Sequence, residues 1–189
     1  MRRRTGARRA AASPGWRRTA GVSLLELLLV SLLMTVLLAM AWPSFRPLID
    51  RSRVNLAASE FHAAILAARA EALRRGARVD VIPVQAPDWR YGWLVLVDEN
   101  NNQRFDPGEP LIQRGGSDIA GLQVDARLRD PKKAYLAFDP RGRPRSVSSS
   151  QVPQIGSLVF SVGAARRKLI ISFLGRVRLC DPDRETATC

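Results

Sequence analysis

Gly21-Val22-Ser23-Leu24-Leu25-Glu26 opens the stretch that decides the fold of this 189-residue chain. Residues 22–41, VSLLELLLVSLLMTVLLAMA, form an apolar run of twenty residues with a single charge, Glu26. At about 1.5 Å of rise per residue, a helix of this length just spans the hydrocarbon core of a bilayer. The sequence therefore predicts a long N-terminal helix whose first half is suited to a membrane.

Basic residues precede this run. The first 21 residues contain no acid and hold seven of the thirteen net positive charges, on Arg2, Arg3, Arg4, Arg8, Arg9, Arg17 and Arg18. Because positive residues stay on the cytoplasmic side of a span, we expect a single-pass inner-membrane protein with a cytoplasmic N-terminus and a periplasmic C-terminal domain. A net charge of +13 alone suggests nucleic-acid binding, but more than half of it belongs to this leader.

Three interpretations of the apolar run stay open. A secretory signal peptide would carry a small-x-small cleavage site, which Ala39 and Ala41 offer. A plain transmembrane anchor would leave Glu26 unexplained, because an acid in a spanning helix is costly unless it is paired. The third interpretation explains Glu26 through a cleavage and assembly signal.

Gly21 followed by V-S-L-L-E and the apolar run resembles the class III signal of type IV pilins and pseudopilins. In that family a prepilin peptidase cuts after the glycine and the new N-terminal residue is methylated. The glutamate fifth from that end pairs with the N-terminal amine of a neighbouring subunit. The resemblance implies cleavage after Gly21, methylation of Val22 and an assembly role for Glu26. Val22 replaces the usual phenylalanine, and the leader is long.

The second half of the helix has an amphipathic pattern. Apolar residues recur at spacings of three and four, which predicts a face that packs on a sheet: Val54, Ala57, Ala58, Phe61, Ala64, Ile65, Ala68, Ala72 and Leu73. Gly76 is a natural helix stop.

Short apolar runs follow, separated by Gly, Pro, Asn and Asp, and they predict strands over 79–84, 93–97, 110–113, 122–128, 135–138, 158–162 and 169–173. The polar stretch 146–154 is expected to be a mobile loop. A long helix followed by many strands predicts an α+β fold, with the helix packed on an antiparallel sheet as in pilins. The expected segments are a removed leader (1–21), a membrane and assembly half-helix (22–42), an amphipathic half-helix (43–76) and a periplasmic β-rich domain (77–189).

An oxygen-rich stretch follows the segment DWRYGW at 88–93. The segment and the stretch together resemble a part of the GspH/FimT branch of the pilin family, in which a W-x-x-GW strand leads into a D-x-N-x-N loop. The oxygen ligands also occupy positions 1, 3, 5, 9 and 12 of an EF-hand-like loop, at Asp98, Asn100, Asn102, Asp106 and Glu109. Gln103 stands where such a loop needs glycine, and a polar hairpin turn is the alternative. We expect no cofactor, with calcium as a weak candidate.

The two cysteines, Cys180 and Cys189, would be exported by the topology above. An oxidising compartment favours a disulfide between them, which would tie the C-terminal tail to the last strand.

Basic residues of the body gather late in the chain, and the candidates for binding DNA are Arg141, Arg143, Arg166, Arg167, Lys168, Arg176 and Arg178. Guanidinium groups suit phosphate oxygens. In FimT-like minor pilins a G-R-x-R element near the C-terminus contacts DNA in natural transformation, and residues 175–178 resemble it. A solvated strand face is the alternative explanation.

The expected function is therefore that of a minor pilin or pseudopilin, a structural subunit of a type II secretion pseudopilus or a type IV pilus. The alternative is a FimT-like subunit that binds DNA. The expected partners are other pilins of the filament, the prepilin peptidase, the inner membrane and, for the alternative, DNA. An enzyme is not expected, because the chain has one histidine and no nucleophile, metal or phosphate-loop motif.

Overall fold

A computed structural model describes residues 21–189 apart from 117, 131–133, 148, 150 and 186–188. Residues 1–20 of the predicted leader (1–21) lie outside the described residues. The chain divides into two compact units, Met1–Pro43 and Ser44–Cys189, and each is described by itself. In the part of the chain that the structure describes, no helix is both long and apolar enough to cross a membrane.

One helix, α1 (Leu24–Arg75), precedes all the strands. The Oγ of Ser23 accepts hydrogen bonds from the backbone N–H groups of Leu25 (3.2 Å) and Glu26 (3.4 Å), so Ser23 caps the start. The helix ends at Arg75, and Gly76 takes a positive φ of 61° that suits a glycine after a helix.

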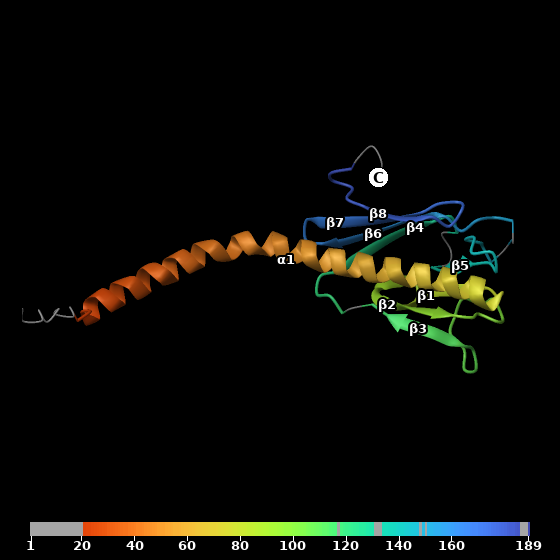
Figure 1. The fold of residues 1–189 in the computed structure, drawn as a ribbon, viewed down its shortest axis with the longest axis horizontal. Helices are drawn as coiled ribbons and strands as arrows, with labels where there is room; N and C mark the ends of the chain where they lie inside the picture. Colours follow the sequence, from red (N-terminus) through yellow and green to blue (C-terminus); the bar gives the residue numbers. More distant parts are fainter. Residues whose placement is uncertain (1–20, 117, 131–133, 148, 150, 186–188) are drawn as a thin grey trace, which may run out of the picture. The chain divides into compact units, whose positions relative to one another are not determined.

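Among the described residues, eight strands follow the helix and form two antiparallel sheets in place of the single sheet expected (Figure 1). Sheet A has the order β3-β2-β1-β5, and sheet B has the order β4-β6-β7-β8. Their bounds are β1 (Val79–Gln85), β2 (Asp88–Leu96), β3 (Leu111–Gly115), β4 (Gln123–Leu128), β5 (Leu136–Phe138), β6 (Gly156–Val162), β7 (Ala165–Ile171) and β8 (Val177–Cys180). Every predicted strand overlaps an observed one, but β7 ends at Ile171 rather than at Phe173.

The main core lies between the second half of α1 and both sheets. The predicted helix face is buried, except for Leu73, which is 53% exposed. Phe61 is central: its ring centroid lies 5.2 Å from that of Trp89 and 6.4 Å from that of Trp93, both on β2 of sheet A. It also lies 5.6 Å from the ring of Phe160 on β6 of sheet B. One helix side chain therefore joins the two sheets.

A smaller apolar cluster consists of Ile82, Leu96, Tyr135 and Ala137. Ile82 of β1 points into it, whereas Val79 and Val81 of the same strand belong to the main core. Two described residues of the stretch 146–154, the expected mobile loop, contact this cluster. Gln154 is fully buried; its Nε2 donates to the carbonyl of Tyr135 (3.1 Å), and its Oε1 accepts from the N–H of Asp130 (3.2 Å). Val147 donates its N–H to the Tyr135 hydroxyl (2.9 Å). These polar contacts attach the described residues Val147 and Gln154 to the cluster.

Asp80, also on β1, is fully buried. Its carboxylate accepts two hydrogen bonds from the guanidinium of Arg78, at 2.7 and 2.9 Å. Burial raises the pKa of Asp80 to about 6, and the Arg78 pair offsets only part of that effect.

Candidate functional site

The N-terminal part of α1 presents an apolar surface. Gly21 and Val22 precede the helix and are exposed. The large apolar side chains between Leu24 and Leu38 are all exposed by half or more of their surface. An unpartnered apolar face of this extent suits contact with lipid or with other apolar helices.

The hydroxyl groups within this surface are already bonded to their own helix. Ser31 donates to the carbonyl of Leu27 (2.8 Å), and Thr35 donates to the carbonyl of Leu32 (2.7 Å). The Glu26 side chain is different: it is exposed in the first helical turn, and its carboxylate has no partner among the described residues. The predicted assembly residue is thus the one open polar group described along Leu24–Leu38.

Two five-residue turns in the second unit, residues 139–143 and 172–176, have the same architecture, and we call them the twin turns. In the first, Asp139 donates its N–H to the carbonyl of Arg143 (2.9 Å), and Gly142 donates to the carbonyl of Asp139 (2.8 Å). In the second, Ser172 and Arg176 form the matching bond (2.9 Å), and Gly175 donates to Ser172 (2.9 Å).

A side-chain acceptor closes each turn in the same way. The N–H of Arg143 donates to Asp139 Oδ1 (2.9 Å), and the N–H of Arg176 donates to Ser172 Oγ (3.1 Å). Gly142 and Gly175 have positive φ values of 69° and 77°. The shared pattern is an oxygen side chain, two free positions, glycine and arginine.

The twin turns touch each other. A Cβ atom placed on Gly175 would lie 2.8 Å from the carbonyl oxygen of Gly142. Arg69 of α1 joins them: its Nη1 donates to the carbonyl of Gly175 (3.2 Å), and a Cβ on Gly142 would lie 3.1 Å from its Nε. Turns about thirty residues apart in sequence therefore form one surface at the end of α1.

Four predicted DNA-binding residues belong to this surface or to the strand that leaves it: Arg141, Arg143, Arg176 and Arg178. Each is exposed, and within the described part of the chain none of the four forms an ion pair. Arg145 instead pairs with Asp139 at 3.4 Å. Arg74 and Arg75 at the end of α1 both bond Glu71, and these bonds lower the pKa of that carboxyl to about 2. The twin turns therefore concentrate cations that are not neutralised locally.

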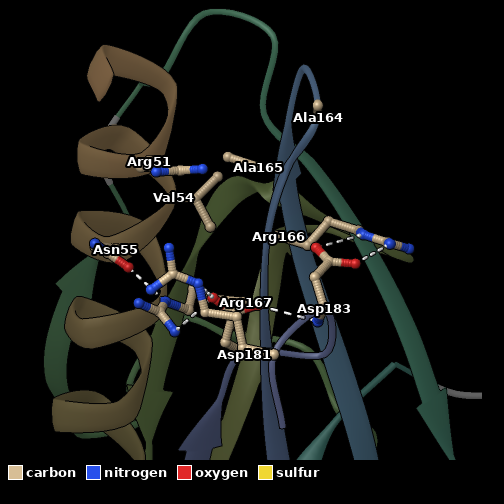
Figure 2. A pocket seen from close by; sticks show the side chains of 10 residues that line it. Arg51, Val54, Asn55, Ala164, Ala165, Arg166, Arg167, Asp181 and Asp183 are labelled. Carbon is tan, nitrogen blue, oxygen red and sulfur yellow. Dashed lines mark hydrogen bonds and ion pairs between the residues drawn. The ribbon is translucent and has the colours of Figure 1, made fainter. Parts of the chain in front are cut away.

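The other three predicted residues, Arg166, Arg167 and Lys168, lie on β7 and have partners. Figure 2 shows the two arginines. Arg166 pairs with Asp183. Arg167 donates to Asn55 Oδ1 (2.6 Å) and pairs with Asp181 (3.5 Å), and Lys168 donates to the carbonyl of Cys189 (2.7 Å). We call these contacts the brace, because they tie the C-terminal segment to α1 and β7.

The disulfide between Cys180 and Cys189 is present and closes the same C-terminal segment. A polar pocket of about 230 Å³ lies beside the brace, lined by Arg51, Val54, Asn55, residues 164–167, Asp181, Asp183 and Arg184 (Figure 2). Its charged side chains mostly bond one another, so its chemistry is that of a salt-bridge network.

The oxygen-rich loop connects β2 to β3, which pair as antiparallel neighbours. Asp98 accepts from the N–H groups of Asn102 (3.1 Å) and Gln103 (2.8 Å). Asp106 accepts from the side-chain amides of Asn100 (2.7 Å) and Asn102 (2.6 Å), which lowers its pKa. Glu109 accepts from the N–H groups of Glu99 and Asp106. The carboxylates thus hold the loop closed, and no group of three acidic, histidine or cysteine residues suited to a metal occurs among the described residues.

Comparison with known proteins identifies the relatives of this fold. The family described as Type II transport protein GspH matches residues 57–175, which is more than half of the chain. The chain belongs to the GspH family. It is also 39% identical over 165 residues to the pilin-like protein PilA1 of Thermus thermophilus, covering 84% of this chain and 97% of that protein.

Solved structures show the same fold. Two crystal forms of the type IV minor pilin FimU of Pseudomonas aeruginosa match this GspH-family chain with TM-scores of 0.54 and 0.50. They are 20% and 19% identical, and they cover 71% and 69% of this chain and 92% and 94% of their own. This GspH-family chain thus has the fold of a type IV minor pilin.

The GspH match ends at Gly175, one residue before Arg176, so the two arginines of the G-R-x-R element lie beyond it. Three residues of the twin-turn surface are missed by sequence reasoning: Arg69, Phe173 and Leu174. Phe173 was placed in a predicted strand, whereas it is exposed in the second turn. A G-R dipeptide that repeats after D-P-R and after S-F-L is the sequence signal that could have identified the pair of turns.

Proposed function

We propose that this GspH-family protein is a filament subunit of a secretion pseudopilus or a type IV pilus, and that it assembles through its N-terminal helix. The observation that carries the proposal is the carboxylate of Glu26, which has no partner among the described residues of an otherwise apolar helix. A carboxylate buried in an apolar bundle is strongly destabilising unless a cation reaches it. The Glu26 carboxylate is therefore neutralised within an apolar bundle only when another subunit supplies that cation.

The proposed cation is the amine that cleavage after Gly21 would create on Val22 of a neighbouring subunit. Ser23, the residue after Val22, caps the start of the helix, so the amine of Val22 would lie next to a fixed helix start. Before assembly, the arginine-rich leader and the apolar run 22–41 support insertion into the inner membrane with the N-terminus in the cytoplasm. Prepilin peptidase and other pilins are the partners this route requires, and no catalytic step is assigned to the chain itself.

Replacing Glu26 tests this role. Glu26→Gln keeps the shape of the side chain and removes its charge, so the protein should still be inserted and cleaved but should enter filaments poorly. Ser31→Ala is the matched control, because the Ser31 hydroxyl is already bonded within the helix. The measurements are the amount of protein in sheared filaments and the mass of the mature N-terminus, expected to begin at a methylated Val22. Normal incorporation of Glu26→Gln would remove the proposed role.

A second function, DNA binding, is favoured by one specific observation. The twin turns carry Arg141, Arg143 and Arg176, and Arg178 follows on β8; the acid of the first turn, Asp139, pairs with Arg145 and with none of these four. Guanidinium groups that lack partners suit phosphate oxygens, and such a contact is sequence-independent and sensitive to salt. This arrangement supports the FimT-like alternative, in which the subunit captures DNA.

Charge removal at the turns tests DNA binding. Full-length protein in non-ionic detergent should bind labelled DNA, and Arg176→Ala/Arg178→Ala should weaken binding at least several-fold. The matched control is Arg104→Ala/Arg114→Ala, which removes the same charge from exposed positions in the loop before β3 and on β3 itself. Equal affinity of both double variants would leave the filament role standing without DNA binding at this surface.

A further inference from the structure

The second of the twin turns carries two exposed apolar side chains beside its arginine. Phe173 is 55% exposed and Leu174 is 64% exposed, and both lie between Ser172 and Gly175. We infer that the twin turns bind unpaired nucleotides, with the Phe173 ring stacking on a base while the neighbouring arginines contact phosphates. This inference rests on the proposed DNA binding and specifies its substrate as single-stranded rather than duplex DNA.

The architecture of the turn does not require these side chains. The first turn has the same hydrogen bonds but carries Pro140 and Arg141 at the two equivalent positions. An exposed phenylalanine followed by an exposed leucine is therefore a feature added to one copy of the turn. Solvent exposure of such residues is unfavourable, which suggests that the pair serves contact with another molecule.

Hydrogen bonds fix the backbone of the turn that carries Phe173. Ser172 receives the N–H groups of Gly175 and Arg176, and Gly175 is fixed by Arg69 and by its close contact with Gly142. A preorganised platform loses little conformational entropy when a ligand binds. Because every base has a π-face, stacking on an exposed aromatic ring is tolerant of sequence.

Duplex DNA does not offer this contact, since its bases are already stacked and paired. The arginines of the twin turns would hold the backbone of either form, whereas the ring gains a partner only when a base is free. A membrane surface is the other ligand that combines negative charge with apolar contact. Two apolar side chains bury little area in a bilayer, and membrane affinity scales with that area, so the surface favours nucleic acid.

Fluorescence anisotropy with full-length protein in non-ionic detergent separates these ligands. The probes are a labelled oligothymidylate, an abasic oligonucleotide of the same length and a duplex of the same length. Oligothymidylate should bind more tightly than the duplex. Phe173→Ala should weaken oligothymidylate binding by roughly tenfold and leave the abasic and duplex affinities unchanged. Phe173→Trp should retain the affinity, because it keeps an aromatic face.

Phe105→Ala is the matched control, since Phe105 is an exposed phenylalanine in the loop before β3. Thermal unfolding of each variant checks that the turn has not simply unfolded, and Leu174→Ala provides a second substitution beside the ring. An equal loss of abasic and oligothymidylate binding in Phe173→Ala would overturn the stacking role.

The remaining outcomes separate the inference from the function on which it rests. Arginine-dependent binding of duplex and oligothymidylate with equal affinity would keep DNA binding and overturn the preference for unpaired nucleotides. Absence of binding to all three probes would remove both. Displacement of oligothymidylate by micelles doped with phosphatidylglycerol, with the loss of that displacement in Phe173→Ala, would assign the pair to lipid instead.

Discussion

Glu26 and Asp80 are both carboxylates set among apolar residues, and the chain treats them differently. Asp80 has its own cation, because Arg78, two residues earlier, donates from Nε and Nη2 to the two carboxylate oxygens. Glu26 has no such partner among the described residues. A carboxylate satisfied within the chain serves the fold, whereas one left open points to a partner outside it.

Asp80 should make the stability of the protein depend on pH. Its pKa is about 6 in the folded state, against an ordinary value of 3.8. As pH rises from 4 to 6, the unfolded chain loses this proton first, so ionisation favours unfolding. We expect this group to lower the free energy of unfolding by about 2 kcal/mol over that interval, with little further change above about pH 7.

Urea unfolding at several pH values checks this effect by comparison with Asp80→Asn, which cannot ionise. As pH rises from 4 to 6, the natural chain should lose stability relative to Asp80→Asn, so its free energy of unfolding minus that of the variant should fall. Asp125→Asn is the control, because Asp125 is exposed on β4. Parallel stability curves for the natural chain and Asp80→Asn would show that the Asp80 proton is not linked to folding.

Gly175 should tolerate a side chain less well than Gly76, although both have positive φ values. A Cβ on Gly76 meets nothing within 4 Å, so Gly76→Ala should cost only the backbone strain of about 1–2 kcal/mol. Gly175→Ala adds a contact of 2.8 Å with the carbonyl of Gly142, which cannot move away like a flexible side chain. We expect about 1–3 kcal/mol of further destabilisation. Thermal unfolding of the two variants measures the difference, and equal costs would mean that the twin turns are free to separate.

At the scale of the elements, periodicity predicted the helix and the strands better than their arrangement. Apolar residues at spacings of three and four identified the buried face of α1, because burial repeats with the helical turn. Leu73 is the exception, because it lies two helical turns after the exposed Leu66, at the edge of the buried face, whereas the neighbouring Ala72 is fully buried. The division into two sheets was not predictable, because alternation marks a strand without naming its neighbours.

The site was predictable only in part for the same reason. Arginines at 141–143 and 176–178 are visible in the sequence, but their proximity depends on two glycines meeting across about thirty residues. The partners of Arg166 and Arg167 likewise come from α1 and from the C-terminal segment. Two sets of arginines that look alike in sequence therefore differ in the structure. Those on β7 form ion pairs with acids, and those of the twin turns do not.

Phe61 should be central to the packing of α1 on the sheets, since its ring contacts aromatic residues of both sheets. Phe61→Ala removes a side chain that is 2% exposed and leaves a cavity between α1 and the sheets. We expect a loss of about 3–5 kcal/mol in the free energy of unfolding, measured by urea denaturation. Leu66→Ala, on the exposed side of the same helix, should cost well under 1 kcal/mol. Similar losses in the two variants would contradict the assigned helix face.

The disulfide should stabilise the C-terminal segment by restricting the unfolded chain. Cys180 and Cys189 are nine residues apart, and closing so short a loop contributes about 2–3 kcal/mol. Reduction should lower the urea midpoint accordingly. Cys180→Ser/Cys189→Ser should have the midpoint of the reduced protein, and adding reductant should not change it. An unchanged midpoint on reduction would show that the brace alone holds the segment.

At the scale of the whole molecule, the charge of +13 divides into parts with different roles. Seven positive charges belong to the predicted leader, and removal of that leader would leave the chain near +6. Within the second unit, the brace uses its cations to hold the fold, while the twin turns leave theirs exposed. Location therefore decides what the charge can do, and net charge by itself does not.

Two variants of equal net charge should separate these roles. Arg176→Ala/Arg178→Ala and Arg166→Ala/Arg167→Ala each remove two positive charges, one pair at or beside the twin turns and the other from the brace. The first should flatten the dependence of log Kd on log salt by about 1.5 units, because each lost phosphate contact removes about 0.7–0.9, and should leave the unfolding midpoint unchanged. The second should lower the unfolding midpoint and leave the salt dependence unchanged, because those guanidinium groups already bond acids. Equal changes in salt dependence for the two variants would show that DNA responds to the net charge of the molecule rather than to the twin turns.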